Sequence, residues 1–414
     1  MTNTEGSGRA WIGPVLIAMG ASGLSQGFGR LTFAFVLPSM VPGLVGSFSA
    51  AGTLAAVNLA AYLVSVLAMI SLSSRVEATR LLRLGLIFSV AGLVAAGVAP
   101  NYEMLVGSMI LLGFGSGISW IACVPIVTAH APMERRGVAF GVMHAGIGLS
   151  AVLIGLLAWF VQSLFGSDAW RPVWLIEAII GIAILALVVG RLKPVGRQAP
   201  RVKAVSGSAE HTAHRFPRNL RWLFIGYGLF GVVHALYISF LISALRTDAG
   251  LSIGQSAQVY SVLGLLNVAG GVTLGRASDA VGRRAILVGS LVTMSACAFV
   301  IPSASDGVAL ISGATYGLLM SGFSTVVIAY IGDVLSQDQV AAKYSIITAA
   351  VGLGQMVGPP IGGALADATG TFRSTYMLAS AVALVAAAAA AMLKSNTSSR
   401  EGRGPNRPCG HRQR

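Results

Sequence analysis

The sequence predicts an all-α integral membrane protein with twelve transmembrane helices. Its composition, its apolar segments and the distribution of its basic residues all point this way. Hydrophobic residues make up 55% of the 414 residues and charged residues only 10%, whereas about a quarter of a soluble domain is charged. The mean hydropathy is +0.78. So few charges cannot cover a protein of this size in water, so the composition argues against a soluble enzyme and excludes a disordered chain.

Twelve segments each contain the roughly 20 mostly apolar residues that a bilayer-spanning helix needs. The first is too long for the apolar core of a cleavable signal peptide, and eleven more follow it, so we expect an uncleaved first span. The predicted spans are residues 11–37, 48–72, 81–99, 104–130, 137–163, 170–190, 220–245, 253–274, 285–302, 307–332, 340–366 and 373–393.

The basic residues predict the orientation, because loops rich in Lys and Arg stay in the cytoplasm. With the N-terminus in the cytoplasm, the inner segments hold 24 of the 28 Lys and Arg residues and the outer loops hold three, while Arg30 lies within the first span. We therefore expect a multi-pass protein of the plasma (inner) membrane with both termini cytoplasmic. The net charge of +14 follows from this topology. No basic module with interleaved aromatic residues indicates nucleic-acid binding.

A basic stretch that contains several prolines divides the chain near its middle. We expect an N-terminal six-helix bundle over 1–190, a cytoplasmic linker over 191–219, a C-terminal six-helix bundle over 220–393 and a disordered polar tail over 394–414. The two halves also resemble copies of each other, which is typical of transporters that rock one half against the other around a central site. At offsets of 204 and 208 residues the matches include Gly113 with Gly317, Gly23 with Gly231 and Gln26 with His234.

A specific motif follows the eighth predicted span. It reads Gly275-Arg-Ala-Ser-Asp279-Ala-Val-Gly282-Arg283-Arg284. This stretch resembles the signature loop of the major facilitator superfamily, in which a Gly and an Asp precede Gly-Arg-Arg or Gly-Arg-Lys. The same register of the first half carries Ser74 in place of the Asp.

Other motifs are similar to the YbfB/YjiJ-type branch of this superfamily. They are Gly27-Phe-Gly29-Arg30 in the first span, Asn58 with Tyr62 in the second, and Gly354-Gln355-Met-Val-Gly358-Pro359-Pro360 in the eleventh. The resemblance covers all twelve spans. It implies two pseudo-symmetric six-helix bundles around a central cavity lined by spans 1, 4, 7 and 10. It also implies a monomer that moves a small solute across the lipid bilayer by alternating access, and we expect neither cofactor nor metal.

Arg30 is the first candidate for substrate binding. It shares a helix face with Gln26, and a guanidinium in a cavity can hold a carboxylate with two hydrogen bonds. Alternatively, Arg30 is structural, bonding helix-end carbonyls or pairing with Glu177. Glu177 itself is interfacial, paired with Arg30 or Arg171, or a carrier of a coupling proton.

The other candidates are polar or aromatic residues within spans. His234 can couple protons or bond substrate, because histidine titrates near neutral pH. The amides Asn58 and Asn267 either bond substrate or hold helices together. Tyr237 shares a helix face with His234. Tyr316, Met320 and Phe323 recur along the tenth span, where they either form the cavity wall or serve helix packing alone.

The resemblance assigns an inner gate to Gly275, Asp279, Gly282, Arg283 and Arg284. An Asp near Arg side chains and helix N-termini can form charge-assisted hydrogen bonds that hold one side of the protein shut. Asp333, at the inner end of the tenth predicted span, is a plausible partner for Arg283.

These residues favour a transporter over other membrane proteins. The chain has no His-x-x-x-His box, no Gly-x-Ser-x-Gly and no phosphate-binding Gly-x-x-x-x-Gly-Lys, so we expect neither an enzyme nor an ATP-driven pump. The single cation predicted in the cavity favours a small polar or anionic metabolite, moved by a proton gradient or by exchange. The alternative is an exporter of lipophilic compounds, which Phe33, Met320 and Phe323 favour.

Overall fold

The computed structural model describes residues 11–166, 168–196, 218–335 and 337–394. Within these residues, twelve helical segments are long and apolar enough to cross a membrane. They coincide with the twelve predicted spans, so the predicted all-α membrane architecture is confirmed. The predicted tail and most of the predicted linker fall outside the described residues.

The first span is the most irregular. It runs from α1 (Ile12–Ser22) through a π-helical segment, η2 (Gly23–Phe28), into α2 (Gly29–Met40) and a second π-helical segment, η3 (Val41–Val45). The other spans are α3 (Phe48–Leu72), α4 (Ala78–Val98), α5 (Tyr102–His130), α6 (Arg136–Phe165), α7 (Arg171–Arg191), α9 (Arg218–Thr247), α10 (Ile253–Val281), α11 (Arg283–Val300), α12 (Asp306–Val334), α13 (Gln337–Thr369) and α14 (Arg373–Ala391).

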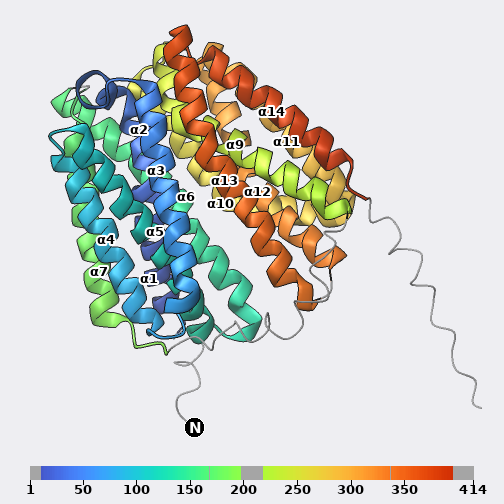
Figure 1. The fold of residues 1–414 in the computed structure, drawn as a ribbon. Coiled ribbons are helices and arrows are strands. Elements are labelled where there is room, and N and C mark those ends of the chain that lie inside the picture. The colour runs from blue at the N-terminus through green and yellow to red at the C-terminus, as the bar shows by residue number, and fades with distance from the viewer. Residues whose placement is uncertain (1–10, 167, 197–217, 336, 395–414) are drawn as a thin grey trace, which may run out of the picture.

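Two bundles lie side by side in Figure 1, with α1 to α7 in one and α9 to α14 in the other. The glycines matched in the sequence occupy equivalent contacts in the two bundles. A Cβ added to Gly113 would overlap the carbonyl oxygen of Asn58 on α3, and a Cβ added to Gly317 would overlap that of Leu263 on α10. Helices can approach this closely only where no side chain intervenes.

The two bundles contact each other through α3 with α13 and through α6 with α10. Gly148 on α6 packs against the carbonyl of Gly264 on α10. At the start of α3, the backbone N–H groups of Phe48 and Ser49 donate to the Asp367 carboxylate at 2.9 and 2.8 Å. Since α1 runs across the protein before α3 begins, this contact lies on the side opposite the start of α1.

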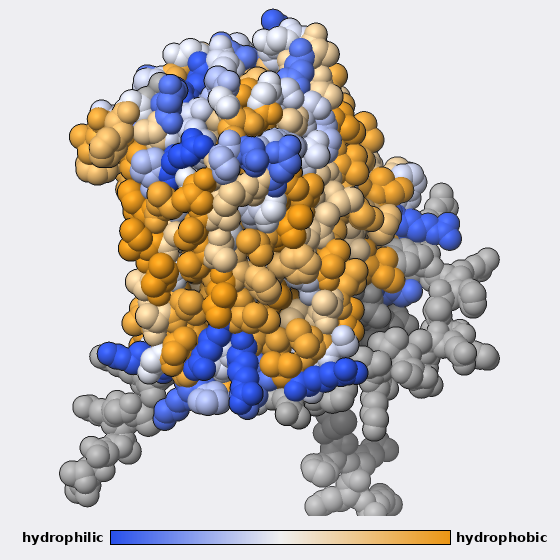
Figure 2. All heavy atoms as spheres, turned by 60° about the vertical axis from the view of Figure 1, so that its left-hand side comes forward, coloured by the Kyte–Doolittle hydropathy of each residue, from blue (hydrophilic) through white to orange (hydrophobic). Residues whose placement is uncertain are grey.

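The surface carries a broad apolar band between two more hydrophilic ends, as Figure 2 shows. Large apolar side chains remain exposed on several helices, including Leu67 at 64% and Ile311 at 70% exposure. Such a band suits a bilayer, because polar side chains are costly in its hydrocarbon core. The helices satisfy their own backbone hydrogen bonds there.

Candidate functional site

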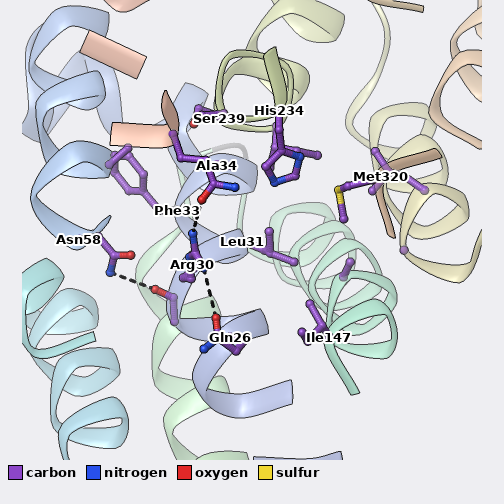
Figure 3. A pocket seen from close by; sticks show the side chains of 18 of the residues that line it. Gln26, Arg30, Leu31, Phe33, Ala34, Asn58, Ile147, His234, Ser239 and Met320 are labelled. Atoms are coloured by element: carbon purple, nitrogen blue, oxygen red, sulfur yellow. Dashed lines mark hydrogen bonds between the residues drawn. The ribbon is translucent and has the colours of Figure 1, made fainter. Parts of the chain in front are cut away.

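A cavity lies between the two bundles and is lined by residues of both (Figure 3). Its polar lining residues from the first bundle are Gln26, Arg30 and Asn58; those from the second are His234, Ser239, Tyr260, Asn267 and Gln355. The rest of the lining is apolar and includes Leu31, Phe33, Ile147 and Met320. The sequence had predicted Arg30, Gln26, His234, Asn58 and Asn267 here, and the structure brings all five together.

The π-helical segment η2 ends at Phe28, directly before the turn that carries Arg30. The segment packs on α6, where a Cβ at Gly23 would lie 2.9 Å from the carbonyl oxygen of Gly146. π-Helical turns within α-helices occur frequently at functional sites. Gln26, which belongs to η2, lines the cavity, so this π-helical segment lies at the candidate site.

Asn58 lines the cavity, but its side chain is used for contacts between helices next to the π-helical segment. Its side-chain amide donates to the carbonyl of Gly29 at 3.3 Å and to that of Met109 at 3.1 Å. It thereby joins α2, α3 and α5 and uses its N–H donors on the backbone. Of the two roles expected for Asn58, its contacts fit that of holding helices together.

Arg30 has neutral partners. Its guanidinium donates to Oε1 of Gln26 at 3.2 Å and to Oε1 of Gln355 at 3.3 Å, and its Cζ lies 5.2 Å from the centre of the Tyr62 ring. Gln26 is oriented by its own donation to the Ser116 carbonyl at 3.0 Å. Within the described ranges, no Asp or Glu forms an ion pair with Arg30.

His234 and Asn267 line the cavity from the second bundle and retain unused hydrogen-bonding atoms. Nδ1 of His234 and Oδ1 of Asn267 are buried and have no hydrogen-bond partner within the described part of the chain. The His234 ring stacks on Phe230, with ring centroids 5.9 Å apart. Figure 3 shows the ring directed toward the space beside Arg30 and Leu31.

The structure corrects the prediction that Tyr237 binds substrate in the cavity, and of the two roles open for Tyr316 its contacts fit packing. Both are fully buried inside the second bundle, and their rings stack with centroids 3.6 Å apart. The Tyr237 hydroxyl lies 3.1 Å from Oγ of Ser312. Phe323, also expected in the wall, stacks on Phe230 with ring centroids 4.5 Å apart. Helix periodicity placed Tyr237 with His234 and Tyr316 with Met320, but of these four only His234 and Met320 line the cavity.

Glu177 on α7 is completely buried and pairs with neither Arg30 nor Arg171. Its two carboxyl oxygens lie 2.9 and 2.8 Å from Oγ1 of Thr32 on α2, within the described part of the protein. Arg171 instead donates to the Ala99 carbonyl at 2.6 Å. The buried carboxyl therefore contacts the first span two residues beyond Arg30.

The gate motif lies partly on a helix rather than in the expected loop. Helix α10 continues through Asp279 to Val281, because its end is set by Gly282, whose φ of +106° favours glycine. Arg283 then begins α11; its side chain contacts Asp279 at 2.6 Å and Asp333 of α12 at 3.1 Å. The expected Arg283–Asp333 contact is thus present. Arg284 is exposed beside it.

Three residues that were not predicted as site residues lie at the cavity or contact Arg30. Gln355 and Tyr62 were noted only as parts of motifs, yet they contact Arg30. Tyr260 donates its hydroxyl to the Leu31 carbonyl at 3.0 Å, which joins the two bundles beside the cavity. A polar amide such as Gln355 within an apolar span was the available signal, since polar side chains in spans are costly unless they have a partner.

Comparison with known proteins places these features in a family. Residues 22–391 match the family described as uncharacterised MFS-type transporter YbfB. The chain is 25% identical to the hexuronate transporter of Bacillus subtilis over 71% of this chain and 74% of that protein. It is 22% identical to monocarboxylate transporter 12-B of Danio rerio over 71% of this chain and 68% of that protein.

A solved structure shows the same fold. It is a bacterial homologue of the human lysosomal transporter Spinster in an inward-facing and occupied conformation. The two superpose with a TM-score of 0.72 at 14% sequence identity, over 92% of this chain and 96% of the other. Twelve spans in two matched bundles, the Gly282-Arg283-Arg284 motif and the family match agree, and the chain belongs to the YbfB-type family of the major facilitator superfamily of transporters.

Proposed function

We propose that this transporter carries a small organic anion across the membrane by alternating access. The observation that carries the proposal is Arg30, a cation in a cavity between the bundles that has only neutral partners among the described residues. A charge at mid-bilayer costs at least about 2.5–3.5 kcal/mol. An anionic ligand that binds and leaves during transport is the partner that compensates for this cost.

The geometry around Arg30 suits a carboxylate. The amide oxygens of Gln26 and Gln355 are neutral acceptors, whereas an ionised carboxylate adds charge attraction and can accept two parallel hydrogen bonds from the guanidinium. An arriving carboxylate therefore competes well for the guanidinium, whereas a cationic compound meets a like charge. The hexuronate and monocarboxylate transporters among the relatives are named for carboxylate substrates, which supports this choice.

Alternating access requires that each side of the cavity closes in turn. The bundles contact each other on the side where α3 begins, and Asp279, Arg283, Arg284 and Asp333 lie on the side where α10 ends. We assign these four residues to the gate of that second side, with Gly275 and Gly282 shaping the backbone. The excess of basic residues supports our inference that this side, with both termini, faces the cytoplasm. Labelling of a cysteine introduced there from outside intact cells would contradict the orientation.

Proton coupling is assigned to Glu177, with His234 as the second candidate. Glu177 is buried against Thr32 on the same helix as Arg30, so a change in its charge acts directly on the segment that holds the anion. In proteoliposomes, an imposed pH gradient should drive anion accumulation by wild type but not by Glu177→Gln, which should still exchange anion for anion. Gradient-driven accumulation by the variant would exclude Glu177 as the proton site.

The anion proposal is tested with purified protein and a library of carboxylates and hydrophobic cations. A bound ligand raises the melting temperature by mass action. Carboxylates should do so for wild type and for the control Ile311→Ala, an exposed apolar position, but not for Arg30→Ala. The alternative, an exporter of lipophilic compounds, is supported by Phe33 and Met320 in the lining. If only hydrophobic cations raise the melting temperature, and equally in wild type and Arg30→Ala, the anion proposal fails and the exporter function is supported.

A further inference from the structure

The second bundle presents a set of polar atoms that the anion alone does not use. Oδ1 of Asn267 on α10 and Nδ1 of His234 on α9 are buried without a partner in the described chain, and both residues line the cavity. A buried polar atom without a hydrogen bond is destabilising, so such atoms usually have an explanation. A ligand that bonds them when it binds provides one.

A hydroxyl group is the partner that these atoms fit best. The Asn267 oxygen accepts a hydrogen bond, and the His234 nitrogen accepts or donates according to its tautomer. A hydroxyl both donates and accepts, so it satisfies either atom in either state. An ammonium group donates equally well, but the positive charge of Arg30 in the same cavity disfavours it.

The carbon skeleton of such a ligand has apolar surroundings. Leu31, Ile147 and Met320 line the cavity, and Figure 3 shows Leu31 beside Arg30 and below the His234 ring, with Met320 and Ile147 farther to the right. Among the described lining residues Arg30 carries the only full charge. The site therefore offers one place for a carboxylate, apolar walls and a second polar region.

We propose that the substrate is a hydroxylated monocarboxylate, held by its carboxylate on Arg30 of the first bundle and by hydroxyl groups on His234 and Asn267 of the second. This inference rests on the proposed function and narrows it. The substrate contacts both bundles, and its carboxylate replaces the amide of Gln355 on the Arg30 guanidinium. Binding thereby exchanges a contact between the protein's own bundles for one made through the ligand.

The test compares acids that differ only in hydroxyl groups, using the purified full-length protein and isothermal titration calorimetry. The pairs are lactate with propionate, gluconate with hexanoate, and mandelate with phenylacetate; glucitol supplies hydroxyls without a carboxylate. In wild type, at least one hydroxylated acid should bind about tenfold or more tightly than its partner. The ratio should fall to near one when His234→Phe is combined with Asn267→Leu. Phe keeps the stacking on Phe230 that His234 makes.

His144→Phe is the matched histidine control, because His144 lies outside this cavity and its Nδ1 bonds the Phe140 carbonyl of its own helix. It should keep the wild-type ratio. Equal binding within every pair overturns this inference and leaves the anion proposal standing. A ratio that persists in the double variant overturns the assignment to His234 and Asn267. If no acid binds, or if glucitol binds as tightly as gluconate, both proposals fail.

Discussion

The two bundles can be compared position by position, because the repeat aligns them. At an offset of 204 residues, Gly113 and Gly317 both pack against a backbone carbonyl of a neighbouring helix. At an offset of 208, Gly23 and Gly231 also match: Gly23 packs against Gly146 of α6, and Gly231 packs against a carbonyl of α13. These two matched pairs of glycines thus make the same kind of helix contact in both bundles.

The two bundles share these glycine contacts, but they differ in the side chains that line the cavity. At the same offset of 208 residues, Arg30 corresponds to Ile238 and Gln26 to His234, and all four line the cavity. The first bundle contributes the cation, and the second contributes unpaired neutral atoms. Packing constrains the two repeats alike, because each must form the same bundle, whereas a single asymmetric ligand needs different groups from each.

The two bundles also differ in the contacts made by the gate motif and by its counterpart in the first half. In the second bundle, Arg283 joins α11 to Asp279 of α10 and Asp333 of α12. In the first, the Ser74 hydroxyl donates to the carbonyl of Ser71 at 2.9 Å. A nearby Glu77–Arg80 pair at 2.9 Å stays within three residues of sequence. Among the described residues, ion pairs join three helices at this end of the second bundle, and no ion pair joins helices at the matching place in the first.

The largest effect is expected from placing a second charge beside Arg30. Gln355→Glu changes an amide oxygen 3.3 Å from the guanidinium into a carboxylate, which occupies the cation permanently. Carboxylate binding should weaken by about 2–5 kcal/mol, the usual cost of removing one partner of a buried charged pair. Calorimetry measures it. Gln355→Leu, which adds no charge, should weaken binding far less. Equal binding by Gln355→Glu and wild type would remove Arg30 as the anion anchor.

The glycine contacts should be equally sensitive in the two bundles. Gly113→Ala and Gly317→Ala each force a Cβ against a backbone carbonyl, and overpacking typically costs about 1–3 kcal/mol. Thermal unfolding in detergent should show comparable losses for both. Gly107→Ala and Gly307→Ala are controls on the same two helices with open space at the Cβ position. If only one of the two variants loses thermal stability, the glycine contacts of the two bundles are not equivalent.

The gate should give the smallest effect. The Asp279 side chain is 63% exposed, and exposed ion pairs contribute about 0–1 kcal/mol. Asp279→Asn should therefore slow transport in proteoliposomes by about fivefold at most, with normal insertion into the membrane. Ser74→Ala, at the matching place in the first bundle, should have a weaker effect still. An unchanged rate in Asp279→Asn would exclude a gating role.

Local patterns in the sequence determine much of the architecture. The length and hydropathy of each segment determined the twelve spans, since a helix that crosses a bilayer needs about 20 mostly apolar residues. Periodicity along one helix placed Arg30 and Gln26 on one face, and they are hydrogen-bonded. The signature motif, together with the position of Asp333 at the inner end of the tenth span, predicted the Arg283–Asp333 contact, and it is present at 3.1 Å.

Contacts between distant segments were decided by the tertiary structure. Gln355 meets Arg30 across 325 residues of chain, and Thr32 meets Glu177 across 145. Tyr237 points into its own bundle although His234, one turn earlier, lines the cavity. Helical periodicity defines which residues share a face of a helix. The rotation of each helix about its axis depends on how all the neighbouring helices pack, and no local pattern in the sequence contains that information.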